Sequence, residues 1–251
     1  RADLKEEARK QYEIAKERKD FELMKKYAAR TSVLTREMVG EAKKLVSAMG
    51  LPVIQAPSEG EAQAARIVWN GDAYAEVSQD FDCMVFGVPR MVRNLTITER
   101  RKLPGKLSQA PVKPEIIELE SNLSSMGIDQ DQLIAISMLV GTDYNPGGIK
   151  GIGPKKALNI VKANKEDFDK LFREAGWREN FDFECRAVFD TIKDMPVTDD
   201  YSISWNPPDS TELKRLLVEE HEFSEKRVDD VLGKLDAEKN KRSQTGLGEF
   251  I

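Results

Sequence analysis

The sequence predicts an α/β protein with a mostly parallel central sheet flanked by helices, a helical arm at the start of the chain and a helix-hairpin-helix region after residue 145. The first observation behind this prediction is the alternation of strand, helix and strand across residues 51–77, which is typical of parallel sheets covered by helices. The second is the run I149-K-G-I-G-P-K-K-A157, whose glycines are typical of a tight turn between two helices.

Residues 1–50 are expected to be helical. Charged residues with few apolar positions fill residues 1–29, with a break near Lys19 and Asp20, and an apolar stripe over residues 33–49 ends at Gly50. The first limb has too little apolar surface for an ordinary core helix. It is either a solvated helical hairpin or a mobile, mildly basic arm over a substrate.

The elements between residues 51 and 140 follow from apolar patterning and breaker residues. Strands are expected at residues 51–55, 74–77, 84–86, 91–95 and 115–120, and helices at residues 59–69 and 129–140. A polar, proline-rich loop is expected over residues 99–114. The apolar positions beyond residue 157 are typical of core helices, and we assign them no chemistry.

Composition excludes several classes of site. The chain of 251 residues carries a formal net charge of −5, so nucleic-acid binding would have to rest on local basic clusters. No apolar run has membrane-spanning length and no signal peptide opens the chain, which is typical of a soluble intracellular protein. Cys83 and Cys185 are isolated, which argues against a disulfide framework or a thiolate metal site, and the single His221 excludes a histidine-rich one.

Two pairs of carboxylates lie close to predicted strand ends. Glu59 and Glu61 open a helix that Ser58 can cap, and Asp80 and Asp82 follow the strand at residues 74–77. In an extended backbone, residues i and i+2 point to the same side, so the two aspartates can face one point. Carboxylate oxygens suit Mg²⁺ or Mn²⁺ and do not suit zinc.

A purely structural interpretation of the same carboxylates stays open at this point. Ser58 and Glu61 have the spacing of a capping box, and Asp80 or Asp82 can cap the following segment. In addition, residues i and i+2 of a regular helix diverge by about 200°. Glu59 and Glu61 can therefore share a metal centre only at the end of the first turn, and a dinuclear site relaxes that demand.

Asp143 and the glycine motif complete the set of candidate residues. Asp143 follows the helix at residues 129–140 and by itself could be an ordinary turn residue. In the motif, Gly151 and Gly153 allow backbone amides to approach a phosphate at a helix N-terminus. Ala157 permits close helix packing. Counter-charge comes from Lys150, Lys155 and Lys156. Such a site contacts the nucleic-acid backbone without reading bases, so the motif predicts sequence-independent DNA binding.

These motifs resemble those of a flap endonuclease of the structure-specific 5′-nuclease family, which has a PIN-like fold, and of its archaeal type in particular. The resemblance covers essentially the whole chain and rests on A56-P-S-E-G-E-A-Q-A64, D80-F-D-C-M-V-F-G87, L139-V-G-T-D-Y144 and the glycine motif. It implies that the catalytic and metal-binding residues are Glu59, Glu61, Asp80, Asp82 and Asp143. It also implies that Arg1 is a basic gateway residue of an arch, and that the hairpin binds duplex DNA and a monovalent cation.

The activity implied by the resemblance is 5′-flap endonuclease and 5′–3′ exonuclease action in DNA replication and repair. Two Mg²⁺ ions, or Mn²⁺, would support hydrolysis of a phosphodiester bond to a 5′-phosphate and a 3′-hydroxyl. The family's usual N-terminal segment, with further aspartates, is missing from this sequence, so we expect the 251 residues alone to be inactive or nearly so. The alternatives are a relative that acts on other branched DNA, and a non-catalytic DNA- and clamp-binding module.

The end of the chain resembles the motif that binds the sliding clamp (PCNA). Its residues would be Gln244, Leu247, Phe250 and Ile251, with Ile251 in the place of a second aromatic. A frayed tail is the alternative interpretation. The predicted parts are an arch remainder (1–35), a nuclease core (36–145), a hairpin and helical region (146–240) and a clamp-binding tail (241–251). The resemblance implies a monomer tethered to the clamp in the cytoplasm or nucleoid of an archaeal-type cell.

Overall fold

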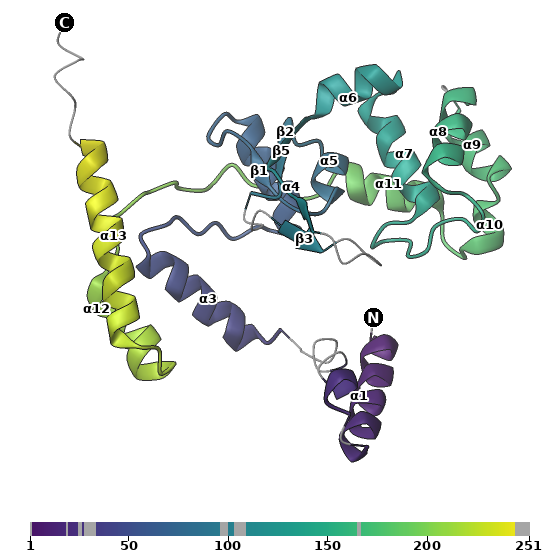
Figure 1. The fold of residues 1–251 in the computed structure, drawn as a ribbon. Helices are drawn as coiled ribbons and strands as arrows, with labels where there is room; N and C mark the ends of the chain where they lie inside the picture. Colours follow the sequence, from purple (N-terminus) through teal and green to yellow (C-terminus); the bar gives the residue numbers. More distant parts are fainter. Residues whose placement is uncertain are drawn as a thin grey trace, which may run out of the picture. The chain divides into compact units, whose positions relative to one another are not determined.

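The computed structural model describes residues 2–18, 20–24, 27, 34–95, 100–102, 109–164 and 167–243. The chain forms two compact units (Figure 1). One contains Gln55–Tyr201, and the other combines the two chain ends, Arg1–Ile54 and Ser202–Ile251. The predicted Arg1 site and the predicted clamp-binding residues lie outside the described residues. In the part of the chain that is described, no helix has both the length and the apolar character needed to span a bilayer.

The sheet of the unit Gln55–Tyr201 has three strands: β1 (Glu76–Val77), β2 (Arg90–Arg93) and β5 (Glu115–Glu118), in the order β1-β2-β5. β1 and β2 are parallel, whereas β2 and β5 are antiparallel. The α/β class is confirmed, but the described sheet is mixed rather than mostly parallel. An antiparallel neighbour needs no crossover helix, and the chain between β2 and β5 contains none among its described residues.

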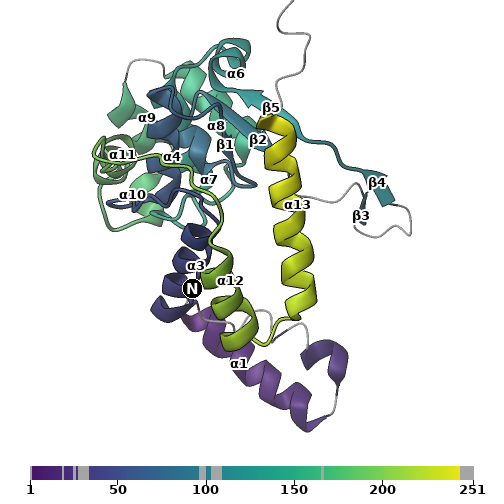
Figure 2. The ribbon, with the colours of Figure 1, turned by 90° about the vertical axis from the view of Figure 1, so that its left-hand side faces the viewer.

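Three local expectations are corrected. Residues 51–55 form no strand, since no described strand pairs with them. They are also not buried as expected, because Leu51 and Val53 are exposed. The run at 84–86 belongs instead to the short helix α5 (Asp82–Val85), since a brief apolar run fits a buried helical turn equally well. The expected loop at 99–114 contains an antiparallel hairpin of β3 (Arg100–Lys102) and β4 (Gln109–Pro111), which projects from the three-stranded sheet in Figure 2.

Helices supply most of the core of this unit. They are α4 (Gly60–Trp69), α6 (Leu119–Met126), α7 (Gln130–Val140), α8 (Pro154–Ala163), α9 (Phe168–Glu174), α10 (Trp177–Asn180) and α11 (Cys185–Lys193). α7 to α11 enclose a large apolar cluster around the buried rings of Phe172 and Trp177, which meet edge to face at 5.1 Å. A second cluster joins α4, α5 and β2 around Met91.

The unit formed by the chain ends contains α1 (Ala2–Glu17), α3 (Arg36–Ala48), α12 (Ser210–Lys214), a π-helix η1 (Arg215–Glu220) and α13 (Glu225–Ser243). Two backbone hydrogen bonds join its halves: the Asn206 amide donates to the Gly50 carbonyl at 2.9 Å and the Asp209 amide to the Ala48 carbonyl at 2.8 Å. Gly50 has φ +78°, and any Cβ there would overlap with the Asn206 carbonyl. Its glycine is therefore required.

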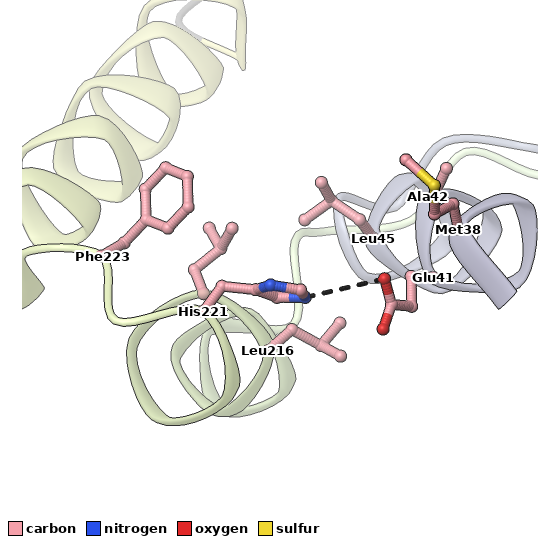
Figure 3. A pocket seen from close by; sticks show the side chains of 8 residues that line it. Met38, Glu41, Ala42, Leu45, Leu216, His221 and Phe223 are labelled. Atoms are coloured by element: carbon pink, nitrogen blue, oxygen red, sulfur yellow. Dashed lines mark ion pairs between the residues drawn. The ribbon is translucent and has the colours of Figure 1, made fainter. Parts of the chain in front are cut away.

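An apolar cavity of about 280 Å³ lies between α3 and η1 in this unit, as Figure 3 shows. Leu45 and Leu216 line it, together with Phe223 beyond the π-helix. At its edge the His221 imidazole faces the Glu41 carboxylate, with Nε2 and Oε2 3.9 Å apart. His221 is the only histidine in the sequence, and none of the five candidate carboxylates lines this cavity.

Candidate metal centre and nucleic-acid interface

Glu59 and Glu61 are positioned at the start of α4 but do not cap it. Glu59 is the N-cap residue with an extended backbone, and its side chain makes no capping hydrogen bond. The expected capping role of Ser58 and the alternative Ser58–Glu61 capping box are therefore wrong. Instead, the Tyr144 hydroxyl donates to Glu59 Oε1 at 2.9 Å, and the Ser78 hydroxyl donates to Glu61 Oε1 at 2.9 Å. These contacts draw both glutamates toward the loops that carry the aspartates.

Asp80 and Asp82 lie in the connection from β1 into α5. The Asp80 amide donates to Ser78 Oγ at 3.0 Å, and the Phe81 amide donates to Asp80 Oδ1 at 2.8 Å. Phe81 has φ −91° and ψ −1°, and Asp82 is the first residue of α5. The extended-backbone argument for this pair is therefore wrong, because the chain bends between the two aspartates. The Arg93 guanidinium lies 4.5 Å from the centre of the Phe81 ring and supports the bend from β2.

Asp143 lies in a turn, as the sequence allowed, and the turn is held by Asn145, which the sequence interpretation did not single out. The fully buried Asn145 donates from Nδ2 to the Met138 carbonyl at 2.6 Å, and its Oδ1 accepts the Thr142 hydroxyl at 2.6 Å. Gly148 has φ +59°, and a Cβ there would overlap with the Val140 carbonyl at the end of α7. The asparagine two residues after Asp143 is a familiar turn signal. Its burial, however, becomes visible only in the fold.

The four other predicted carboxylates lie near enough to Asp82 for their charges to act on it. Burial raises the pKa of Asp82 above its ordinary value. The negative charges of four further carboxylates raise it further, in the order Asp80, Glu61, Asp143 and Glu59. Glu61 and Asp82 are half-buried, whereas Glu59, Asp80 and Asp143 are exposed. Within the described residues, no three His, Cys, Asp or Glu side chains have the arrangement of a metal site as they stand.

We call the five carboxylates named above the acidic centre. Tyr144 and Cys83 border it. Burial, the hydrogen bond to Glu59 and the charges of Glu59, Asp143 and Asp82 raise the pKa of Tyr144 to about 12. The phenol therefore stays protonated and keeps its donor role at neutral pH. Burial and nearby carboxylates raise the pKa of Cys83 to about 12, so this thiol is no nucleophile.

Glu76 is a sixth carboxylate near the centre, and the sequence interpretation did not single it out. It lies in β1 with 7% of its surface exposed, and its Oε2 has no hydrogen-bond partner. Burial and the charge of Glu61 raise the pKa of Glu76 to about 8. The available signal was a glutamate inside the apolar run of the strand expected at residues 74–77.

The glycine motif forms the expected hairpin between α7 and α8. Gly151 has φ +81°, and Gly153 is the N-cap of α8 with Pro154 in the first helical position. Ala157 is fully buried where α8 contacts α7, which confirms that a small residue is needed there. Lys150, Lys155 and Lys156 are exposed. The first turn of α8 therefore presents backbone amides and basic side chains on one end of the helix.

Comparison with known proteins places this architecture in a family. Residues 50–143 match the XPG I-region family. Flap endonuclease 1 of Staphylothermus marinus is 48% identical over 235 residues, which cover 94% of this chain and 67% of that protein. Flap endonuclease-1 from Methanococcus jannaschii is a structural neighbour with a TM-score of 0.69 and 40% identity, over 86% of this chain and 62% of that one.

A more distant neighbour shows the same fold. The catalytic core of Rad2 in complex with a DNA substrate has a TM-score of 0.62 and 22% identity, over 81% of this chain and 71% of that one. The present chain thus spans about two thirds of the length of the relatives that it matches, 67% in the case of the Staphylothermus marinus protein. From the identity and the coverage together, the chain belongs to the flap endonuclease 1 family.

Proposed function

We propose that this chain carries the carboxylate centre and the duplex-binding hairpin of a nuclease that cleaves 5′ flaps in DNA, with associated 5′–3′ exonuclease action. The products would carry a 5′-phosphate and a 3′-hydroxyl. The observation that carries the proposal is the convergence of four carboxylates on Asp82, a half-buried residue whose pKa they raise. Like charges gathered in this way are stabilised by a divalent cation, so the residues fit one.

The donor set indicates the kind of cation. All five carboxylates offer hard oxygen ligands, which suit Mg²⁺ and Mn²⁺. Glu61, Asp80 and Asp82 are proposed as direct or near-direct ligands, and Glu59 and Asp143 as ligands that act partly through water. When bound, two such ions would activate a water molecule and neutralise the charge on the departing 3′ oxygen. Ser78 and Tyr144 would hold Glu61 and Glu59 in place through the hydrogen bonds described above.

The DNA substrate is assigned through the hairpin and the family. Gly151 and Gly153 allow the α8 amides to approach a phosphate, and Lys150, Lys155 and Lys156 supply positive charge. A monovalent cation at the hairpin, and Arg1 as a gateway residue, remain part of the proposal. So does clamp binding by Gln244, Leu247, Phe250 and Ile251, for which loss of binding in Phe250→Ala is the expected result.

The decisive experiment concerns the carboxylates. In a protein with the full length of the relatives, Asp82→Asn and Asp143→Asn should each abolish Mg²⁺-dependent cleavage of a 5′-flap substrate, while binding of that substrate survives. Glu115→Gln, an exposed glutamate in β5, is the matched control and should cleave normally. Near-normal turnover in both aspartate variants would overturn the assignment. A panel of gaps, bubbles and four-way junctions distinguishes a flap enzyme from a relative with another substrate.

The 251 residues by themselves are proposed to cleave slowly or not at all. One observation supports this: the chain spans 67% of the length of the Staphylothermus marinus relative. Cleavage by the 251-residue chain should therefore be far below that of the same chain extended to the relatives' length. Equal rates would contradict the proposal. DNA and clamp binding without cleavage would mark the chain as a binding module.

A further inference from the structure

Glu76 is a buried carboxylate inside a strand, where charged side chains are uncommon. It is in β1 with 7% of its surface exposed, and its Oε2 has no hydrogen-bond partner. A buried carboxylate without a partner is costly, so such groups are kept only where something compensates them. The neighbouring apolar cluster, which contains Cys83 and Met91, offers no compensation.

The direction of the side chain follows from the strand. Ser78 continues the ladder of β1, since its amide donates to the Val92 carbonyl at 3.3 Å. Residues i and i+2 of a strand point to the same face, so Glu76 and Ser78 share one face of β1. The Ser78 hydroxyl donates to Glu61 at 2.9 Å. Glu76 therefore lies on the side of β1 that faces Glu61.

Electrostatic coupling supports the same placement. The charge of Glu61 acts on Glu76, and Glu76, Glu61 and Asp80 all act on Cys83. Cys83 is fully buried next to Asp82 in α5. Glu76 is thus close to the residues beneath the acidic centre, and its orphaned oxygen is the kind of group that a nearby positive charge would stabilise.

We propose that Glu76 is a further carboxylate of the acidic centre, oriented toward Glu61, and that it strengthens divalent-cation binding there as a positioning residue. This inference rests on the proposed function, because the cation is the one assigned to the same five carboxylates. A bound cation favours the ionised form of Glu76, and a negative charge at this depth attracts the cation through a medium of low dielectric, where charges interact more strongly than in water. It also holds the Glu61 carboxylate away from the buried layer and toward the cation.

Binding of Tb³⁺ to the 251-residue chain tests this without any need for cleavage. Tb³⁺ takes oxygen ligands, and Tyr144, which contacts Glu59, can sensitise its luminescence. Competition with Mg²⁺ identifies the site. Glu76→Gln should weaken Tb³⁺ binding about tenfold or more, as is usual when a supporting group of a metal site is removed. Glu76→Asp should retain most of the affinity, and Glu115→Gln, on the exposed side of β5, should retain all of it.

Further measurements separate a loss of cation binding from misfolding. Glu76→Gln replaces the buried carboxylate with an amide of the same shape, so its thermal midpoint in EDTA should be unchanged or higher. If Glu76→Gln fails to fold, Glu76→Ala serves in its place. Unchanged Tb³⁺ affinity in the Glu76 variant alongside weakened affinity in Asp82→Asn would overturn this inference alone. Unchanged affinity in both variants, or no Tb³⁺ binding by the unmodified chain, would also overturn the cation centre of the proposed function.

Discussion

At the scale of single residues, the acidic centre depends on uncharged neighbours as much as on its carboxylates. Five negative groups repel one another, so something must hold each carboxylate in place when no cation is bound. For the two glutamates of α4 the structure shows what does so: the Ser78 hydroxyl for Glu61 and the Tyr144 hydroxyl for Glu59, each at 2.9 Å. Tyr144 directly follows Asp143, so one turn carries both a candidate ligand and the donor that orients another.

Tyr144→Phe tests this dependence. The variant loses the hydrogen bond to Glu59, so we expect a stability loss of about 1 kcal/mol at neutral pH. In a protein of the relatives' length we also expect flap cleavage to slow about tenfold or more, because Glu59 is no longer oriented. Urea unfolding and single-turnover cleavage measure the two effects. Unchanged values for both would show that the hydroxyl positions nothing.

The pH dependence of the same residue has a defined sign. The pKa of Tyr144 is raised from 10.0 to about 12, so the folded chain keeps a proton that the unfolded chain releases. Stability from this group is therefore complete below pH 10 and is lost as the pH rises from about 10 to about 12. Tyr144→Phe should lack this loss. Absorbance at the tyrosinate band should show a late-titrating tyrosine that Tyr144→Phe removes, whereas the late titration of Tyr201, whose pKa is raised by its hydrogen bond to Asp72, should persist in the variant.

Residue types and spacing nominated the two acidic pairs and left a capping interpretation open beside them, and the family resemblance added Asp143 to the set. The local geometry was not predictable in the same way. Asp80 and Asp82 were expected in extended backbone, but the chain bends at Phe81 and Asp82 begins a helix. Glu76 was missed because its burial depends on which face of β1 is covered, and that is a property of packing rather than of the strand's own sequence.

At the scale of elements, the hairpin between α7 and α8 contains two glycines with different physical roles. Gly151 has φ +81°, a conformation that costs other residues about 1–2 kcal/mol, whereas Gly153 has an ordinary φ of −98°. A Cβ at either position would meet no atom within 4 Å. The two positions are therefore a matched pair that differs in backbone conformation and not in space.

We expect Gly151→Ala to destabilise the chain by about 1–2 kcal/mol and to weaken duplex binding, because the amides of the turn lose their alignment. Gly153→Ala should be close to neutral, since a smaller loss of chain entropy on folding offsets a poorer N-cap. Guanidinium unfolding and duplex binding measured on both variants decide the matter. Equal effects of the two substitutions would show that the positive φ of Gly151 is not what the turn requires.

The lysines of the hairpin make a separate prediction. Replacing Lys150, Lys155 and Lys156 with alanine should weaken duplex binding at low salt. It should also flatten the dependence of the logarithm of affinity on the logarithm of salt concentration, by up to about 0.9 for each DNA phosphate that the protein no longer neutralises. Lys113→Ala, an exposed lysine elsewhere in the same unit, is the control and should leave the slope unchanged. A triple variant with the original slope would exclude the hairpin as a phosphate-binding surface.

Helices and turns were predicted well when the residues that determine them lie within the element itself. The helices α3 and α7 and the hairpin carry their own caps, glycines and apolar stripes, and the structure confirms them. Residues 51–55 have an equally clear strand pattern, yet they form no strand among the described residues. A strand exists only with a partner, and the sequence of one segment does not contain its partner.

At the scale of the whole molecule, the chain ends form one unit and the middle forms the other. The sequence suggested four consecutive parts, and their functional boundaries stay predictions. A segment-by-segment analysis of the sequence could not predict the backbone hydrogen bonds that join residues 48–50 to residues 206–209. Local patterning contains no information on such distant partners. The one local sign of this contact was Gly50. The sequence analysis interpreted it as a helix end, and in the structure the backbone of Asn206 also approaches it closely.

Each apolar cluster lies within one unit, and this predicts how the chain unfolds. Leu171 and Leu216 are each 3% exposed, but Leu171 belongs to the large cluster around Trp177 and Leu216 to a small one with Ala48 and Leu213. Replacing either leucine with alanine removes the same atoms, at a cost of about 2–5 kcal/mol that depends on how far the site collapses. We therefore expect each substitution to lower the stability of its own unit.

Two probes resolve these effects. In a Trp205→Phe background, tryptophan fluorescence comes from Trp69 and from Trp177, whose indole is buried and donates to the Phe183 carbonyl at 2.7 Å, and it reports on the unit Gln55–Tyr201. Its urea midpoint should fall in Leu171→Ala and stay unchanged in Leu216→Ala. Hydrogen exchange of the α3 amides should respond in the opposite way, because α3 contributes Ala48 to the cluster of Leu216. If both substitutions move both probes equally, the chain unfolds as one cooperative body, and the division into separately stabilised units is wrong.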